Sequence, residues 1–231
     1  MADKNNKPLR TVRSYVRRES RITPAQVRAL GELWPRYGIP EGTAPLDWPA
    51  EFGRVAPVVL EIGFGNGEAL AAAAAAHPED DYFGIEVHRP GAGSLLRRIE
   101  TAGLSNLRVM LGDASEILAQ RIPDASLSAV RLFFPDPWPK KRHHKRRLVQ
   151  PEFAALVARK LAPGGYFHLA TDWPAYAEHM VAVLSCTAGL VDVGGTEAFQ
   201  ERVAQRLATR FEQRGRRLGH EVRDLLYRRQ A

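Results

Sequence analysis

Residues 57–70 read PVVLEIGFGNGEAL and contain the most informative pattern for the fold of this chain. The β-branched apolar run Val58–Ile62 predicts a buried strand, and the run Glu68–His77 predicts a helix. Between them, Gly63–Gly67 reads G-x-G-x-G, which predicts a turn that leads directly into the helix N-terminus. The stretch therefore contains the strand, glycine-rich turn and helix from which the remaining chain can be followed in both directions.

Strands and helices alternate from this stretch toward the C-terminal part of the chain. Further strands are expected at Tyr82–Glu86, Leu107–Leu111, Leu127–Phe134, Tyr166–Thr171 and Glu221–Arg229. Further helices are expected at Arg89–Ala102, Ala114–Arg121, Glu152–Leu161 and Pro174–Ser185. Because strict alternation implies right-handed crossovers, the sequence predicts an α/β fold with a mostly parallel sheet and helices on both faces. Ligands of such folds bind at the carboxyl ends of the strands.

Two segments precede this alternating region. Residues 1–21 hold seven Lys or Arg and few apolar residues, so we expect a flexible basic arm that either grips nucleic acid or is a plain unstructured terminus. Thr23 and Pro24 predict the start of a short helix that runs to about Trp34, followed by a proline-rich lead-in. We expect residues 22–231 to form a single domain.

Composition narrows the class of protein. The formal net charge of +7 makes nucleic acid the first partner to consider, with acidic membrane surfaces second. No apolar run approaches the roughly 20 residues of a membrane span, and the N-terminus lacks the apolar region of a signal peptide. The single cysteine, Cys186, excludes an intrachain disulfide and a zinc knuckle. We therefore expect a cytoplasmic protein without a membrane segment.

Acidic side chains stand at the ends of three successive strands. Glu61 closes the first strand, Glu86 the second, and Asp113 follows the third. We expect these three carboxylates to surround one pocket with negative charge. Such a pocket suits a ligand with an ammonium group, a sulfonium and a ribose diol, which are the groups of S-adenosylmethionine. In that interpretation Glu86 accepts hydrogen bonds from the ribose hydroxyls, and Asp113 accepts one from the adenine amino group. Glu61 lies near the methionyl ammonium. The methionyl carboxylate would use amides of the glycine turn.

Two other interpretations of these acids stay open. They could serve only to cap helices in a protein without a ligand. Alternatively, the fold could bind a nicotinamide dinucleotide, but that fingerprint places its third glycine at position 68, where this chain has Glu68. A ring of negative charge would also repel a pyrophosphate.

The stretch PDPWPKKRHHKRR, residues 135–147, combines a rigid turn with a dense run of cations. Three prolines fix Asp136 beside Trp138, and six of the eight residues from Lys140 to Arg147 are Lys or Arg. Fixed carboxylates commonly serve chemistry and basic runs commonly bind phosphates, although a solvated surface loop is the alternative. We expect no metal at His143 and His144, because they lack partners at ligand spacing.

Two later stretches are also unusual. Asp172 ends a strand at the same sheet edge as Asp136, and capping of the helix from Pro174 is its alternative role. Downstream, arginines recur at i, i+4 spacing, which would stack them on one helical face or on an ordinary salt-bridged surface. They are Arg202, Arg206, Arg210 and Arg214.

Taken together, these stretches closely resemble the bacterial tRNA (guanine-N7) methyltransferases, a family of S-adenosylmethionine-dependent Rossmann-like enzymes. The matching segments are EIGFGNG (61–67), GIEVHRPG (84–91), GDA (112–114), FPDPWPKKRHHKRRL (134–148), HLATDW (168–173) and TRFEQRGRRLGHEVRDLLY (209–227). EIGFGNG is generic to methyltransferases, whereas the FPDPWPKKRHHKRRL and TRFEQRG segments are specific to this family. The N-terminal arm matches poorly.

The resemblance implies methylation of a guanine N7 in the tRNA variable loop by a Rossmann-like seven-stranded domain whose last strand is antiparallel. It implies a cofactor site formed by Glu61, Gly63, Gly65, Gly67, Glu86, Asp113 and Asp136, with Asp136 also catalytic. It implies substrate binding by Lys140, Asp172, Thr209, Arg210, Phe211 and Glu212. It implies RNA contacts by Arg142, His143, His144, Lys145, Arg146 and Arg147. We expect a monomer, with a homodimer as the alternative.

The chemistry sets modest demands on the protein. Guanine N7 carries an in-plane lone pair and no proton, so alignment and electrostatics should dominate over general-base catalysis. Asp136 could stabilise the positive charge that develops on the purine, Asp172 could accept from guanine N1 and N2, and Lys140 could contact O6 or a phosphate. A non-catalytic RNA-binding protein would explain the basic run, but not the acids at three strand ends.

Overall fold

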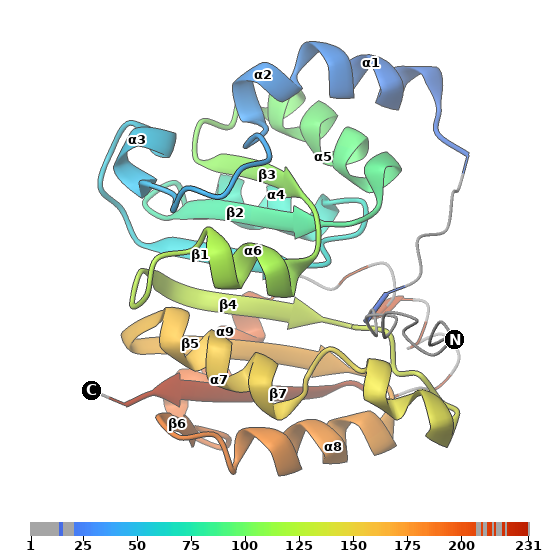
Figure 1. Cartoon of the computed structure of the whole chain (residues 1–231), viewed down its shortest axis with the longest axis vertical. Helices are drawn as coiled ribbons and strands as arrows, with labels where there is room; N and C mark the ends of the chain where they lie inside the picture. The colour runs from blue at the N-terminus through green and yellow to red at the C-terminus, as the bar shows by residue number, and fades with distance from the viewer. Residues whose placement is uncertain are drawn as a thin grey trace, which may run out of the picture.

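The computed structural model describes residues 14–15, 21–206, 209, 212–213, 215, 219 and 221–230 (Figure 1). In this part of the chain a seven-stranded sheet has the order β3-β2-β1-β4-β5-β7-β6. The strands are β1 (Val58–Ile62), β2 (Asp81–Glu86), β3 (Leu107–Leu111), β4 (Leu127–Phe133), β5 (Leu161–Thr171), β6 (Leu190–Asp192) and β7 (Arg223–Arg229). Strands β1 to β5 pair in parallel, whereas β7 is antiparallel to both neighbours. The predicted fold class is thus confirmed.

Helices cover both faces of this sheet (Figure 1). They are α1 (Pro24–Glu32), α2 (Trp34–Tyr37), α3 (Trp48–Phe52), α4 (Glu68–Ala76), α5 (Arg89–Ala102), α6 (Ala114–Gln120), α7 (Pro151–Lys160), α8 (Pro174–Leu184) and α9 (Glu197–Gln205), with the 3-10 helix η1 (Lys141–Arg146). Among the described residues, no helix has both the length and the apolar character needed to cross a membrane.

Strand β1 lies inside the sheet, between β2 and β4, and is buried along its whole length. Because side chains alternate along a strand, Val58 and Leu60 pack in the core beneath α6, α7 and α8. Val59 packs on the opposite face in a core shared with α1, α4 and α5. Helices on both sides therefore explain why apolar residues predominate in this strand, on both of its faces.

The structure confirms most predicted elements and adds several. Helix α1 begins with a capping box, because the Thr23 and Gln26 side chains each accept from the other residue's backbone amide. Strand β5 begins earlier than predicted, at Leu161, and its pairing with β4 shifts register before Tyr166. Helices α2, α3 and α9, the 3-10 helix η1 and the short edge strand β6 were not predicted.

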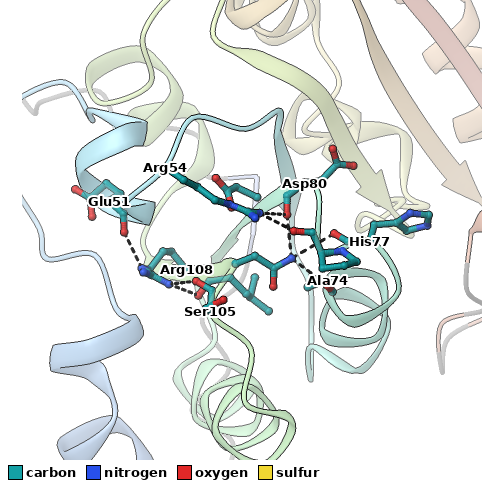
Figure 2. Close-up of polar contacts among 11 residues, drawn as sticks. Glu51, Arg54, Ala74, His77, Asp80, Ser105 and Arg108 are labelled. Atoms are coloured by element: carbon teal, nitrogen blue, oxygen red, sulfur yellow. Dashed lines mark hydrogen bonds and ion pairs between the residues drawn. The ribbon is translucent and has the colours of Figure 1, made fainter.

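Polar contacts fasten the amino ends of β2 and β3 (Figure 2). Two guanidinium nitrogens of Arg54 bond to Oδ1 of the buried Asp81, at 2.9 and 2.7 Å. The Asn106 side-chain amide donates to the carbonyl oxygens of Ala74 and Asp80, at 3.0 and 2.9 Å. These contacts join the end of α4 to the starts of β2 and β3, so they stabilise the fold at the amino edge of the sheet. The candidate functional residues lie at the opposite, carboxyl edge.

Candidate active site

The acidic residues that the sequence placed at strand ends all lie toward the carboxyl edge of the sheet. Glu61 and Glu86 lie on adjacent strands, and Asp113 follows β3, the next strand outward. Glu61 pairs in register with Gly84, two residues before Glu86, so both side chains belong to the same face of the sheet. We call Glu61, Glu86 and Asp113 the acidic cluster.

Glu86 links the end of β2 to the glycine turn. Its Oε2 accepts from the Gly65 amide at 2.8 Å, and its Oε1 accepts from the amides of Val87 and His88 at 2.8 and 3.1 Å. Burial raises the pKa of Glu86, and the three amide hydrogen bonds oppose that rise. Because a carboxylate offers about four acceptor positions, this geometry leaves capacity for one further donor, such as a ribose hydroxyl.

Glu61 is a buried carboxyl group in a different electrostatic situation. Only 4% of the residue is exposed, and burial raises its pKa to about 7, against the lowering effect of Arg131. Arg131 is its register partner on β4. No hydrogen bond to the Glu61 carboxyl is found within the described part of the chain. A buried carboxylate with this little compensation suits a cationic ligand such as an ammonium group.

Asp113 is a helix cap, as the alternative interpretation proposed. Its Oδ1 accepts from the Ser115 amide at 2.9 Å at the start of α6. The residue is half-buried. Capping and ligand binding are compatible here, because a carboxylate has two oxygens and the cap bond uses Oδ1.

The glycine turn requires glycine for its backbone conformation. Gly63, Gly65 and Gly67 have φ values of 73°, 60° and 71°, in the left-handed region. A side chain at Gly63 or Gly65 would meet nothing within 4 Å, whereas a Cβ at Gly91 would stand 2.1 Å from the Gly65 carbonyl oxygen. The turn thus rests on the start of α5 and has open space beside Gly63 and Gly65. These features fit S-adenosylmethionine at the acidic cluster.

The loop of residues 134–140, which we call the Asp136 loop, has a strained backbone on both sides of Asp136. Phe134 and Trp138 have φ values of 53° and 46°, which are unusual for bulky residues and cost about 1–3 kcal/mol each. The Phe134 amide donates to the Ala170 carbonyl oxygen at 2.7 Å, which fixes the start of the loop to β5. Asp136 is exposed at this carboxyl edge, beside the strand that carries Glu61.

The Trp138 ring packs against two side chains of the basic run, residues 140–147. The Arg146 guanidinium carbon lies 4.6 Å from its ring centroid, and the His143 ring meets it edge-on at 5.9 Å. The indole Nε1 donates to the Ser14 carbonyl oxygen at 3.1 Å. The solvent-facing cations of the run are Lys140, Lys141, Arg142 and Lys145. We call these four residues the basic strip.

Arg147 departs from the expected RNA role. It is only 3% exposed, and its Nε and Nη1 donate to the carbonyl oxygens of Pro137 and Ala175, at 3.0 and 3.2 Å. Its guanidinium carbon lies 4.8 Å from the Tyr176 ring centroid. The side chain therefore fastens the Asp136 loop to α8, and its buried position does not support an RNA contact.

Asp172 follows β5 at the edge where Asp136 lies, as predicted. Its alternative role as a cap is not seen, because the N-cap of α8 is Trp173 and no side chain caps that end. Instead the Trp173 amide donates to Oγ1 of Thr171 at 3.2 Å. Asp172 itself is half-buried.

The predicted substrate residues near the C-terminus are described only in part. Arg210 and Phe211 lie outside the described residues. Glu212 is 1% exposed, its amide donates to the Thr209 hydroxyl at 3.2 Å, and its Oε2 accepts from Arg206 at 2.5 Å. The Glu212 carboxylate thus points into the protein.

The expected arginine face is interrupted at its second member. Helix α9 ends at Gln205, and Arg206 has an extended backbone as its C-cap. The Arg202 guanidinium carbon lies 4.0 Å from the Tyr166 ring centroid, and Arg214 lies outside the described residues. The sequence therefore did not predict that the Arg206 side chain is buried and bonded to Glu212, because its i, i+4 spacing gives no sign of this contact.

A metal site was not expected, and the described residues contain no group of three or more His, Cys, Asp or Glu placed to hold a metal ion. The imidazoles in the basic run pack near cationic side chains: the pKa of His143 is lowered by burial and by the charges of Arg142, Arg146 and Lys140. His144 Nε2 lies 3.3 Å from Nη2 of Arg147.

Comparison with known proteins gives a consistent result. A family model described as "Putative methyltransferase" matches residues 55–225. A protein of Alkalilimnicola ehrlichii named tRNA (guanine-N(7)-)-methyltransferase is 59% identical over 95% of this chain and 93% of its own. One of the same name from Sodalis glossinidius is 56% identical over 97% and 94%. The solved 16S rRNA methyltransferase KamB has a TM-score of 0.57 at 18% identity, covering 79% of this chain and 94% of that one, which shows the fold alone.

Proposed function

Because this chain belongs to the tRNA (guanine-N(7)-)-methyltransferase family, we propose that it transfers a methyl group from S-adenosylmethionine to N7 of a guanine in the tRNA variable loop, forming 7-methylguanosine. One observation carries the proposal. The acidic cluster at β1 to β3, the Asp136 loop after β4 and the basic strip all lie toward the carboxyl edge of one sheet, in which β1 pairs with β4. A methyl donor and a polyanion can therefore approach one another there.

The acidic cluster and the glycine turn would hold the cofactor. Glu86 retains acceptor capacity for a ribose hydroxyl, and Glu61 offers a buried carboxylate to the methionyl ammonium. Asp113 would accept from the adenine amino group, and amides of the Gly63–Gly67 turn would bind the methionyl carboxylate. When bound, S-adenosylmethionine supplies a methyl group that is activated by its sulfonium.

The Asp136 loop and its neighbours would position the guanine. Since N7 carries a lone pair and no proton, the protein needs to align the base and stabilise charge rather than remove a proton. A carboxylate at Asp136 would favour the positive charge that develops on the purine. Asp172 would accept from N1 and N2, which an adenine cannot offer, and Lys140 would contact O6 or a phosphate. Thr209, Arg210 and Phe211 would complete the substrate site. Glu212, whose carboxylate is bonded to Arg206 inside the protein, would act there by holding Thr209 through its amide.

The basic strip would bind the tRNA backbone. Lys140, Lys141, Arg142 and Lys145 face solvent and can neutralise phosphates, while His143, His144 and Arg146 lie beside them half-buried. Arg147 is left out of this surface because its guanidinium is used inside the protein. We propose that the enzyme acts in the cytoplasm, where its tRNA substrate is found, as a monomer, with a homodimer as the alternative.

A product assay tests the proposed function. The protein is incubated with unmodified tRNA and methyl-labelled S-adenosylmethionine, and the tRNA is digested to nucleosides. We expect label in 7-methylguanosine. Asp136→Asn keeps the shape of the side chain but removes its charge, so it should lower turnover by at least about tenfold while tRNA affinity stays within a few-fold. Label in another nucleoside, or none with the folded wild-type protein, would refute the proposal.

A further inference from the structure

Arg206 lies at the centre of a buried polar network that the proposed chemistry does not use. Its side chain is 5% exposed, and Nε and Nη2 donate to Oδ1 and Oδ2 of Asp224 at 2.8 and 3.1 Å. Its Nη1 donates to Oε2 of Glu212 at 2.5 Å. His168 Nε2 lies 2.9 Å from the same Asp224 Oδ1. One guanidinium thus makes a two-pronged bond to one carboxylate and a third bond to another.

These partners come from separate parts of the fold. Asp224 lies on β7, paired in register with Ala170 on β5, and His168 lies on β5 two residues earlier. Glu212 belongs to the predicted substrate residues and bonds through its own amide to the Thr209 hydroxyl. The network therefore joins that segment to the carboxyl half of the sheet.

The same guanidinium also touches the start of the Asp136 loop. Its carbon lies 5.4 Å from the Phe133 ring centroid and 5.9 Å from that of Phe134. Phe133 ends β4, and Phe134 is the strained residue two positions before Asp136. Arg206 consequently contacts the strand that leads to the catalytic loop and the segment that would hold the substrate.

Arginine is the side chain that this arrangement requires. A guanidinium presents five N–H donors in a fixed plane, so it can bind two carboxylates in set directions while its face packs on aromatic rings. A lysine keeps the charge but offers a single flexible ammonium. Burial acts to raise the pKa of Asp224, but His168 and Arg206 lower it overall, which favours the charged carboxylate. Burial lowers the pKa of His168, which favours the neutral imidazole.

We propose that Arg206 is a positioning residue for methyl transfer, which holds Thr209 and Glu212 at a fixed place relative to the Asp136 loop. The inference rests on the proposed function, because it assumes that this segment binds the substrate. An ion pair that only stabilised the fold would have no need to join this segment to the start of the catalytic loop.

The test compares Arg206→Lys with a matched control, Arg121→Lys. Arg121 is also buried, and it donates to the carbonyl oxygens of Pro40, Gly42 and Ala44 in the lead-in segment. Four quantities are measured for each full-length variant: the melting temperature, the affinity for S-adenosylmethionine, kcat/KM for tRNA, and hydrogen exchange of peptides spanning residues 207–215 without tRNA. Asp224→Asn, which removes the charge opposite Arg206 but keeps its shape, is a second variant should Arg206→Lys fold poorly.

We expect Arg206→Lys to lower kcat/KM for tRNA by at least about tenfold, with cofactor affinity within twofold of wild type. Exchange at residues 207–215 should increase, while Arg121→Lys at a similar melting temperature should change neither tRNA kinetics nor this exchange. Unchanged exchange in a folded Arg206→Lys, or equal kinetic losses in both variants, would overturn the inference. Wild-type protein that formed no 7-methylguanosine would instead refute the proposed function, and the exchange measurement would still decide whether Arg206 holds the segment.

Discussion

The Glu86 carboxylate accepts a hydrogen bond from the Gly65 amide and so stabilises the glycine turn. We propose that it also binds a ribose hydroxyl of the cofactor. Glu86→Gln keeps the shape but removes the charge and one acceptor oxygen. Since hydrogen bonds to charged groups contribute about 1.5–3 kcal/mol, cofactor affinity should fall by about 10- to 100-fold in calorimetric titration. Glu68→Gln is the control: its carboxylate lies at the start of the adjacent helix and forms a long 3.5 Å contact with Arg98. Equal affinities for both variants would remove Glu86 from the cofactor site.

Glu61 should make cofactor binding depend on pH. Its pKa of about 7 means that the carboxyl group is largely protonated at pH 6, whereas the bound ammonium favours the ionised form. Affinity should therefore fall about eightfold from pH 7.5 to pH 6, and Glu61→Gln should flatten that dependence. A wild-type affinity that does not change over this range would contradict the assignment.

The same raised pKa affects stability with a definite sign. Between pH 4.5, the ordinary pKa of a glutamate, and about pH 7, the raised pKa, the folded state binds more protons at Glu61 than the unfolded state. The free energy of unfolding therefore decreases as the pH rises through this window, by up to about 3 kcal/mol from this group. Comparing denaturant unfolding of wild type and Glu61→Gln at pH 5 and 8 measures the effect, and a difference between the two proteins that is the same at both pH values would contradict it.

At the scale of elements, the cations of the basic run have two different environments. Lys141, Arg142 and Lys145 face solvent, whereas Arg147 is buried and bonded to backbone carbonyl groups. Replacing Lys141, Arg142 and Lys145 with Ala should flatten the slope of log tRNA affinity against log salt by about 2 to 3 units, because each phosphate contact contributes about 0.7 to 0.9. Arg147→Ala should lower the melting temperature but leave the slope nearly unchanged, since it fastens the loop to α8. Equal slopes for wild type and the triple variant would return these cations to a solvated surface.

Helices and strands with strong periodic patterns were predictable from the sequence, whereas charged side chains that are buried in the protein were not. Val58–Ile62 was placed without error because an interior strand that is covered on both faces is mostly apolar, here with Glu61 as the exception. Arg147 could not be placed, because a basic run gives no sign of which member turns inward. The role of Arg206 depends on Asp224 and Glu212, which meet it only after the chain has folded.

At the scale of the whole molecule, the two edges of the sheet have different uses. The amino edge is closed by contacts such as Arg54 with Asp81 and Asn106 with the end of α4. The carboxyl edge carries the acidic cluster, the strained loop and the basic strip. The acids and the basic run were predictable because strand order in an α/β fold brings strand ends together. The strain at Phe134 and Trp138 required the structure.

We propose that guanine N7 is the atom that receives the methyl group, and an atomic substitution tests this directly. Two tRNAs are prepared that differ only in the variable loop, one with guanine and one with 7-deazaguanine, which has carbon in place of N7. Single-turnover methylation with labelled S-adenosylmethionine is measured for both, together with their affinities. We predict methylation of the guanine tRNA and none of the 7-deazaguanine tRNA, with affinities within a few-fold. Equal methylation of both tRNAs would contradict the account.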